Sequence, residues 1–293
     1  IDAHDGDLHR WIRTGQVRIN GSRAKAFDHV SEGAVVRVPP FASARAVDSA
    51  QPPSSSKKTS VPNVSIVYED RDILVLNKPA GLSVQGGRGH DDCAAARVAQ
   101  AYACAPFIPA PAHRLDRDTS GLLVFGKTYA SLRFLSDAFS GRAAATPRKD
   151  YLAWIDGTWD APPGELRDML ALNPQTRLME PYVKDSPLAY ANVAEARLLA
   201  FPLFTRRIGG MMRSLLMLRL LTGRKHQIRA QLCARGHPVC GDPWYGKGGC
   251  NGLKLHAFRI VLPRMNATAQ EFELLPPWKG PWHVPQHAIN ARP

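Results

Sequence analysis

The stretch HRLDRDTSGLLVFGKT, from His113 to Thr128, contains two patterns that predict different proteins. Its second half has the spacing of a phosphate-binding loop, with Gly121, four variable residues, Gly126, Lys127 and Thr128. Its first half places two carboxylates, two guanidiniums and two hydroxyls ahead of an apolar run. A phosphate-binding loop must lie between a buried strand and a helix, whereas a polar turn can lead directly into a buried strand.

The apolar run favours the second interpretation. The variable positions 122–125 are Leu, Leu, Val and Phe, which is typical of a buried strand and unfavourable for a loop that wraps a phosphate in water. The preceding residues DRDTS do not form the buried strand that a phosphate-binding loop follows. We therefore expect no nucleotide cofactor. The alternative, an ATPase, would lose nucleotide binding on Lys127→Ala.

The composition indicates a globular, basic protein. The chain has 293 residues, of which 44% are hydrophobic, enough for one large domain and a small appendage. A net charge of +13 favours a polyanionic partner such as nucleic acid over an ordinary basic surface. The five cysteines form no C-x-x-C pair and are interpreted as core thiols of a cytosolic protein. With no apolar run long enough to cross a bilayer and no visible signal peptide, we expect a cytoplasmic monomer with no membrane partner.

A change in composition divides the chain into two units. Residues 41–62, FASARAVDSAQPPSSSKKTSVP, are rich in Ser, Ala and Pro, and they predict a flexible linker. Residues 1–40 are expected to form a small basic unit, with a tight turn at Asn20-Gly21 and a strand at VVRVP. Its basic side chains suit phosphate contacts that do not read bases. The predicted RNA-binding residues are Arg10, Arg13, Arg18, Arg23 and Lys25.

The large unit, residues 63–285, is expected to have an α+β fold, a mixed and largely antiparallel sheet with flanking helices, because strands mostly follow strands. Helical patterns cover residues 91–103, 130–139 and 226–236, the last ending on Gly236 as a cap. Strands are predicted over residues 64–70, 73–79, 121–125, 151–157, 193–201, 213–221, 253–262 and 271–275. Residues 286–293 are expected to be a tail. We expect no metal, because His283 and His287 have a helical spacing but no further ligand.

HRLDRDTSGLLVFGKT resembles the central motif of the RluA-type ribosomal RNA pseudouridine synthases. Further segments agree in order and spacing: YEDRDILVLNKPAGLSV, KDYLAWIDG, TGRKHQIRAQL, GHPVCGDPWYG and LKLHAFRI. In addition, IRTGQVRINGSRA and EGAVVRVPP resemble the small S-four-like RNA-binding domain that accompanies the RluC and RluD branches, with its opening helix expected to be incomplete. The resemblance implies the pseudouridine synthase catalytic fold for the large unit.

The resemblance also implies an isomerase that breaks the bond from uracil to ribose in a flipped-out nucleotide, turns the base and rejoins it through carbon five, without cofactor or metal. Asp116, the Asp of HRLD, is implied as the nucleophile, on ribose or on the uracil ring. Arg229 is implied as its partner and is expected to clamp it through two hydrogen bonds. Tyr151 is implied to lie against the base and is a candidate to move the carbon-five proton.

Four residues are implied to bind the substrate. Ile228 corresponds to the apolar residue on the uracil face, and Arg114 to the residue that fills the gap left by the flipped nucleotide. His113 and Lys149, from the same segments, complete this set.

The sequence departs from the family at two positions near the site. Lys225 stands where the family usually has Thr, and Gln231 where His is common. The substrate implied by the resemblance is large-subunit ribosomal RNA, and transfer RNA stays open. The alternative from another class is a non-catalytic RNA-binding or ribosome-assembly factor on the same fold.

Overall fold

The computed structural model describes residue 12 and residues 17–25, 28–37, 61–62, 64–86, 92–186, 188–248, 250–265 and 268–290. Two compact units, Ile1–Lys57 and Lys58–Pro293, make up the chain. The expected linker lies outside the described residues except for its last two. One of these, Val61, is buried in the core of the second unit, so the linker prediction is wrong at this end.

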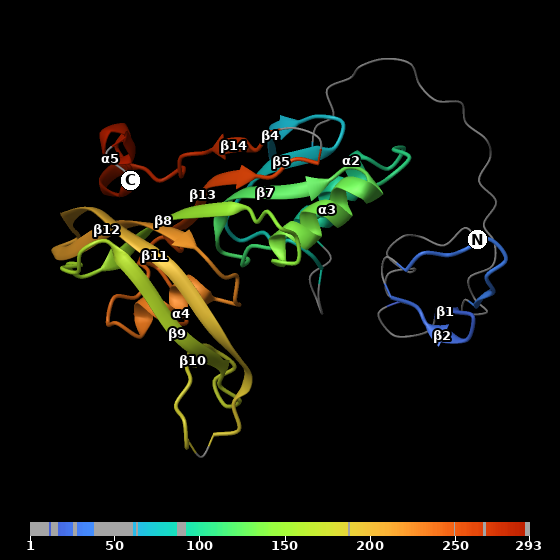
Figure 1. Cartoon of the computed structure of the whole chain (residues 1–293). Coiled ribbons are helices and arrows are strands. Elements are labelled where there is room, and N and C mark those ends of the chain that lie inside the picture. The colour runs from blue at the N-terminus through green and yellow to red at the C-terminus, as the bar shows by residue number, and fades with distance from the viewer. Residues whose placement is uncertain are drawn as a thin grey trace. The chain divides into compact units, whose positions relative to one another are not determined.

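The first unit contains a three-stranded sheet in the order β2-β1-β3 (Figure 1). Its strands are β1 Arg18–Ile19, β2 Ser22–Arg23 and β3 Val36–Arg37. Positive φ angles of 48° at Asn20 and 81° at Gly21 form the tight turn between β1 and β2, which confirms the predicted turn. Asn20 Oδ1 also accepts a hydrogen bond from Val35 N at 2.8 Å. Strand β2 was not predicted.

The basic residues of this unit are only partly described. Arg18, Arg23 and Lys25 are exposed. Arg10 and Arg13 lie outside the described residues.

The second unit is built on an eleven-stranded sheet in the order β10-β9-β11-β12-β8-β13-β7-β5-β4, with β14 paired to β13 and β6 to β7. The strands are β4 Ser65–Glu69, β5 Ile73–Lys78, β6 Ala110–Pro111, β7 Ser120–Gly126, β8 Arg148–Asp156, β9 Gly164–Leu172, β10 Met179–Pro181, β11 Ala191–Ile208, β12 Met211–Leu220, β13 Leu255–Leu262 and β14 Gln270–Glu273. Among these named strands only the β13–β7 pair is parallel. The predicted mixed, largely antiparallel sheet is confirmed.

The helices of this unit are α2 Ala94–Ala101, α3 Tyr129–Phe139, α4 Gln227–Cys233 and α5 Gln286–Asn290, with a short η2 at Gly280–Trp282. Helix α4 ends three residues before the cap predicted at Gly236. Gly236 instead has a φ of 78° in the turn that follows the helix. Its amide still bonds Cys233 O at 2.9 Å, so this glycine closes the helix end without being its cap.

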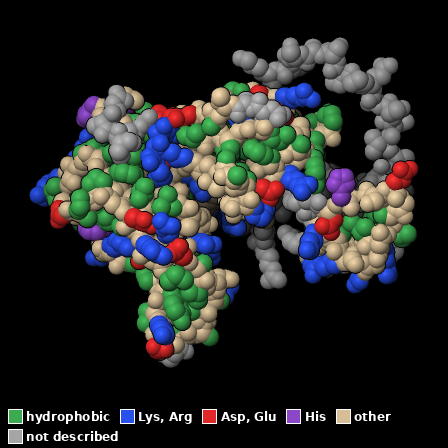
Figure 2. Space-filling view, in the orientation of Figure 1, with side chains coloured by type: hydrophobic (Ala, Val, Ile, Leu, Met, Phe, Trp, Pro, Cys, Tyr) green, Lys and Arg blue, Asp and Glu red, His purple; other side chains and the backbone are tan. Residues whose placement is uncertain are grey.

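Strands β9 to β11 depart most from the predictions, and they form an arm that projects from the rest of this unit (Figure 1). Strand β9 was not predicted, because charged residues interrupt its apolar pattern and the first six of its nine residues are exposed or half-buried. Strand β11 has 18 residues, twice the predicted length, and it passes Pro202 through a register shift. Hydrophobic side chains are visible on this arm (Figure 2). Met169 of β9 is one of the exposed large hydrophobic residues.

Residues 286–290 of the expected tail form the packed helix α5, and residues 291–293 lie outside the described residues. Ala288 and Ile289 of α5 are buried, and Ile289 belongs to the same apolar cluster as Trp154. The indole Nε1 of Trp154 donates a hydrogen bond to Trp282 O at 2.9 Å. The C-terminal segment therefore covers one face of strand β8.

Strand β7 explains both glycines of the phosphate-loop pattern. A Cβ at Gly121, whose φ is 114°, would lie 2.3 Å from Ala257 O of strand β13. A Cβ at Gly126 would lie 2.5 Å from Leu132 Cα of helix α3. Both positions need glycine because neighbouring backbone approaches closely. The prediction that residues 121–125 form a buried strand is confirmed.

The remaining two residues of the pattern also have structural contacts. Lys127 Nζ pairs with Glu69 Oε1 at 2.5 Å and donates to Asp70 O at 2.7 Å. The hydroxyl of Thr128 accepts a hydrogen bond from Ser131 N, which caps helix α3. The lysine is thus held on strand β4 and its following turn.

We expect Lys127→Ala to lower the free energy of unfolding by about 1 kcal/mol, because it removes one partly exposed ion pair. ATP binding should be undetectable in both the wild type and the variant. Urea unfolding and a nucleotide-binding assay measure the two quantities. A selective loss of ATP binding would instead support the phosphate-loop interpretation.

Candidate active site

Sheet register brings the predicted catalytic residues together. Asp116 lies in the turn that leads into β7, where Gly121 pairs with Ala257 of β13. Ala257 pairs in turn with Tyr151 of β8, and helix α4 with Arg229 follows strand β12, which pairs with β8. Three distant segments therefore meet at one cleft of about 450 Å³. Its lining includes His113, Arg114, Asp116, Lys149, Tyr151, Ile228 and Arg229.

Arg229 contacts two carboxylates, and its strongest pair was not predicted. Its Nε and Nη2 donate to the two oxygens of Asp242 at 2.6 and 2.8 Å. Its Nη1 reaches Asp116 Oδ2 through a single hydrogen bond of 3.4 Å. The expected clamp on Asp116 through two hydrogen bonds is therefore wrong, because the fork of the guanidinium faces Asp242.

The pair of Arg229 and Asp242 is a buried, closely packed unit. Their side chains are 3% and 0% exposed. Asp242 also accepts the backbone N–H groups of Trp244 and Tyr245 at 3.0 and 3.1 Å. Although burial opposes ionisation, the hydrogen bonds and charge of Arg229 hold the pKa of Asp242 below its ordinary value. This fixed pair directs an N–H of Arg229 Nη1 at Asp116.

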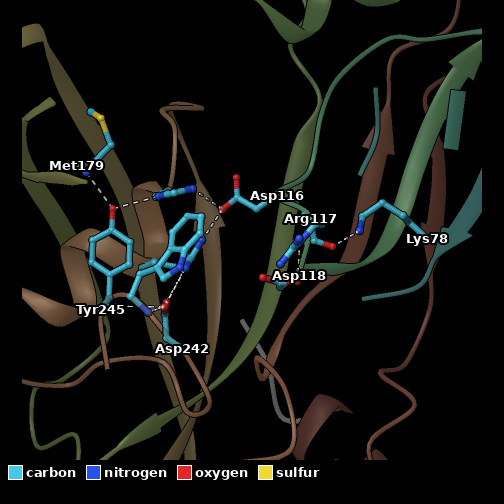
Figure 3. Close-up of polar contacts among 10 residues, drawn as sticks. Lys78, Asp116, Arg117, Asp118, Met179, Asp242 and Tyr245 are labelled. Carbon is cyan, nitrogen blue, oxygen red and sulfur yellow. Dashed lines mark hydrogen bonds and ion pairs between the residues drawn. The ribbon is translucent and has the colours of Figure 1, made fainter. Parts of the chain in front are cut away.

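His226 approaches the same carboxylate from the start of helix α4, in a left-handed conformation with φ of 50°. Burial lowers its pKa to about 4 despite the neighbouring Asp116, so its ring is neutral at neutral pH. The hydroxyl of Tyr245 accepts from Met179 N at 2.9 Å and lies 3.1 Å from His226 Nδ1 (Figure 3). With Nδ1 as the acceptor from this hydroxyl, the ring proton is on Nε2, 3.9 Å from Asp116 Oδ2.

Lys78 holds the other side of the Asp116 turn. Its fully buried Nζ donates to the carbonyl oxygens of Pro79 at 2.9 Å and Leu82 at 2.7 Å. It also donates to the carbonyl oxygen of Arg117 at 2.8 Å (Figure 3). Burial lowers its pKa to about 7, while the charges of Asp118 and Asp116 oppose this change. The carbonyl oxygen of Arg117, the residue that follows Asp116, is thereby bonded to strand β5.

The cleft floor combines an aromatic and an apolar side chain. Tyr151 is 8% and Ile228 is 4% exposed. Burial, and secondly the charge of Asp116, raise the pKa of Tyr151. Burial also lowers the pKa of Lys149, which lines the same cleft. The phenol of Tyr151 is therefore protonated at neutral pH.

His113 and Arg114 have different surroundings although they are adjacent. His113 Nε2 accepts a hydrogen bond from Val124 N at 3.1 Å, and its ring stacks on Phe139 with centroids 4.2 Å apart. Burial lowers its pKa to about 3, so it is a neutral residue tied to strand β7. Arg114 is exposed at the rim of the cleft.

Five residues around the cleft were not predicted individually, although they lie in segments that resemble the family. They are Lys78, His226, Asp242, Trp244 and Tyr245. The spacing of NKPAG or GDPWYG gives no sign that a lysine or an aspartate is buried there. Only the approach of these segments to HRLD in space reveals them.

The cysteines only partly match their interpretation as core thiols. Cys93 and Cys240 are buried, but Cys104 is exposed, so this interpretation is wrong for Cys104. No group of His, Cys, Asp and Glu in the described part of the chain could hold a metal ion. None of the described helices is both long and apolar enough to cross a membrane.

Acid should destabilise the protein through His256, which is fully buried between Ser120 Oγ at 2.8 Å and Leu274 O at 2.9 Å. Burial lowers its pKa to about 4, whereas the unfolded chain binds the proton near pH 6.5. Below pH 6.5 the unfolded state therefore binds more protons, and stability falls by up to about 1.4 kcal/mol per pH unit until pH 4. Between pH 7 and 5, the free energy of unfolding measured in urea should fall less steeply with decreasing pH for His256→Gln than for the wild type. The difference in slope should be up to about 1.4 kcal/mol per pH unit. An unchanged slope would contradict the burial of a neutral histidine.

Comparison with known proteins identifies the family of this chain. The RNA pseudouridylate synthase family matches residues 72–234. The ribosomal large subunit pseudouridine synthase C of Vibrio vulnificus is 32% identical over 94% of this chain and 85% of its own length. The enzyme of the same name from Vibrio cholerae is 33% identical over 86% and 78%. The structure of human RNA Pseudouridylate Synthase Domain Containing 1 superposes with a TM-score of 0.62 and 26% identity, covering 76% of this chain and 87% of that one. The chain belongs to the RNA pseudouridylate synthase family.

Proposed function

We propose that this protein converts uridine to pseudouridine in large-subunit ribosomal RNA, with Asp116 as the nucleophile. The observation that carries this proposal is the meeting of Asp116, Tyr151 and Arg229 at one cleft. The names of the relatives from two Vibrio species support large-subunit ribosomal RNA as the substrate. A cytoplasmic monomer is part of the proposal, and the bacterial relatives named for ribosomal RNA support the cytoplasmic location.

The reaction needs a carboxylate held in place beside the uridine. The bond between N1 of uracil and C1′ of ribose breaks, and a bond between C5 and C1′ forms. C5 loses one proton and N1 gains one, so the atoms balance without a cofactor. Asp116 attacks the nucleotide, at ribose or at the uracil ring, and the covalent bond that it forms is broken again before the product is released. Arg229 donates a hydrogen bond to Asp116 Oδ2, and the neutral ring of His226 lies beside the same oxygen. The fixed pair of Arg229 and Asp242 limits how far this oxygen can move.

The base lies between apolar and aromatic side chains. Ile228 packs on one face of the flipped uracil, and Tyr151 lies against it from strand β8. The raised pKa of Tyr151 means that its phenol starts protonated, so it donates a hydrogen bond to the base before it takes part in any proton transfer. Lys149 and the neutral His113 complete the wall of this cleft.

The basic rim of the cleft contacts the RNA backbone. Arg114, Arg224 and Lys225 line the cleft and are exposed. Basic side chains are spread over the face shown in Figure 2. Arg10, Arg13, Arg18, Arg23 and Lys25 of the first unit supply further phosphate contacts in this proposal. Such contacts bind strongly without reading the sequence.

Tritium release tests the proposal directly. Large-subunit ribosomal RNA labelled at carbon five of uracil is incubated with the protein, without nucleotide or added metal. Release is the expected result, because each isomerisation frees the hydrogen at carbon five. Binding without release from this RNA or from labelled transfer RNA would favour the non-catalytic assembly factor. Release from transfer RNA alone would keep the enzyme and change the substrate.

A further inference from the structure

A second cleft opens on the other side of Asp116. It measures about 360 Å³, and its lining includes Gln85, Arg114, Asp116, Arg117, Arg229 and Trp244. Arg114, Asp116 and Arg229 also line the first cleft, so the two spaces meet at the carboxylate. The roles proposed above for the reaction use only the first cleft.

Trp244 gives this cleft an aromatic surface. It is 54% exposed and is the one tryptophan among the exposed large apolar side chains in the described part of the chain. Beside a cleft, an exposed indole offers a flat apolar surface whose burial would stabilise a bound partner.

The ring is also held in position without a ligand. The guanidinium carbon of Arg229 lies 5.2 Å from its centre, and the ring of His226 lies 5.3 Å away. The backbone N–H of Trp244 is bonded to Asp242 at 3.0 Å. A partner that stacks on Trp244 therefore loses little affinity to ordering of this side chain.

The charge of the cleft selects the kind of partner. Arg114 is exposed, and the Arg117 side chain is 52% exposed with one 3.3 Å contact to Asp118. Exposed guanidiniums beside an exposed indole suit a nucleic acid, whose phosphates pair with Arg and whose bases stack on aromatic rings. The net charge of +13 favours the same class of partner.

We propose that the second cleft binds the nucleotide next to the target uridine, with its base stacked on Trp244. This inference rests on the proposed function, since a uridine in the first cleft places its covalently linked neighbour at the second. The neighbouring base is then unstacked from the target, which keeps the flipped uridine from returning to its stack. Because every base offers a flat face, Trp244 holds this nucleotide with little preference for its identity.

The test compares protein variants with altered RNAs. The uridine modified by the wild type is mapped first, and a short synthetic RNA spanning it is made with an intact or an abasic nucleotide on either side.

Trp244→Ala should raise the KM for tritium release roughly 5- to 100-fold and leave kcat within about threefold. Trp244→Phe should keep most of the affinity. Met211→Ala is the matched control, because Met211 is 53% exposed at the turn between β11 and β12, away from both clefts.

The decisive result is whether Trp244→Ala and the abasic nucleotide remove the same contact. An abasic nucleotide on one side of the target should raise the KM of the wild type by a factor similar to that of Trp244→Ala. The same abasic nucleotide should raise the KM of the Trp244→Ala variant by less than about twofold, because the contact is already lost. A 2-aminopurine at that position should lose fluorescence on binding to the wild type and not on binding to Trp244→Ala. If the abasic nucleotide and Trp244→Ala together raise the KM by the product of their separate factors, the stacking proposal is wrong. A fall in kcat alone would also contradict it and would show that Trp244 acts through Arg229. No release by the wild type would refute the proposed function, and this inference with it.

Discussion

Asp116→Asn is expected to abolish tritium release, by on the order of 10⁴-fold or more, while RNA binding stays close to that of the wild type. Asparagine has nearly the same size and can still accept the 3.4 Å hydrogen bond from Arg229, so the turn should keep its shape. It has no anionic oxygen to attack the nucleotide. Single-turnover tritium release and filter binding measure the two quantities separately.

The matched control is Asp118→Asn, which removes the other carboxylate of the same turn. Asp118 contacts Arg117 at 3.3 Å rather than Arg229 or His226. Its substitution should lower the rate by less than about tenfold, mainly through a changed charge near Lys78. Equal losses in the two variants would contradict the assignment of Asp116 as the nucleophile.

Asp242→Asn is expected to lower the free energy of unfolding by about 3–5 kcal/mol, because it leaves the 3% exposed guanidinium of Arg229 without its main counter-charge. The remaining carboxylate, Asp116, is farther away and partly exposed to solvent. Arg229 would also lose its fixed direction, so tritium release should fall with stability. Urea unfolding at neutral pH measures the first effect.

An exposed ion pair provides the comparison. Asp137 pairs with Arg142 at 2.7 Å, with side chains 37% and 67% exposed. Asp137→Asn removes a similar contact in water and should cost less than about 1 kcal/mol. Similar costs for the two substitutions would show that Asp242 and Arg229 do not form a desolvated pair.

The sequence alone predicts the site better than the arm. Residues 121–125 were assigned to a buried strand because a continuous apolar run has one favourable environment. Strand β9 has the sequence GELRDMLAL, in which charged residues hide the pattern because much of the strand faces solvent. The periodicity of apolar residues indicates which positions are buried. It therefore does not reveal a strand that is held mainly by pairing with its neighbour.

Side-chain partners across the site could not be predicted in the same way. The pairing of Arg229 with Asp242 follows from the path of the chain between helix α4 and GDPWYG, and spacing gives no information on it. The resemblance therefore predicts two hydrogen bonds from Arg229 to Asp116, whereas in the structure these two bonds go to Asp242. Buried Lys78 is a similar case, since its position at the end of a predicted strand gives no information on its three carbonyl partners.

The three hydrogen bonds of Lys78 have a consequence for the order of events in catalysis. They hold the backbone beside Asp116 before any RNA arrives, so the enzyme has little to rearrange when the complex forms. The slow movement then belongs to the RNA, which must release its uridine from the surrounding helix. Weakening the base pairs around the target should accelerate turnover more than any substitution that loosens the protein, and ribosomal RNA that has not yet folded should be the faster substrate.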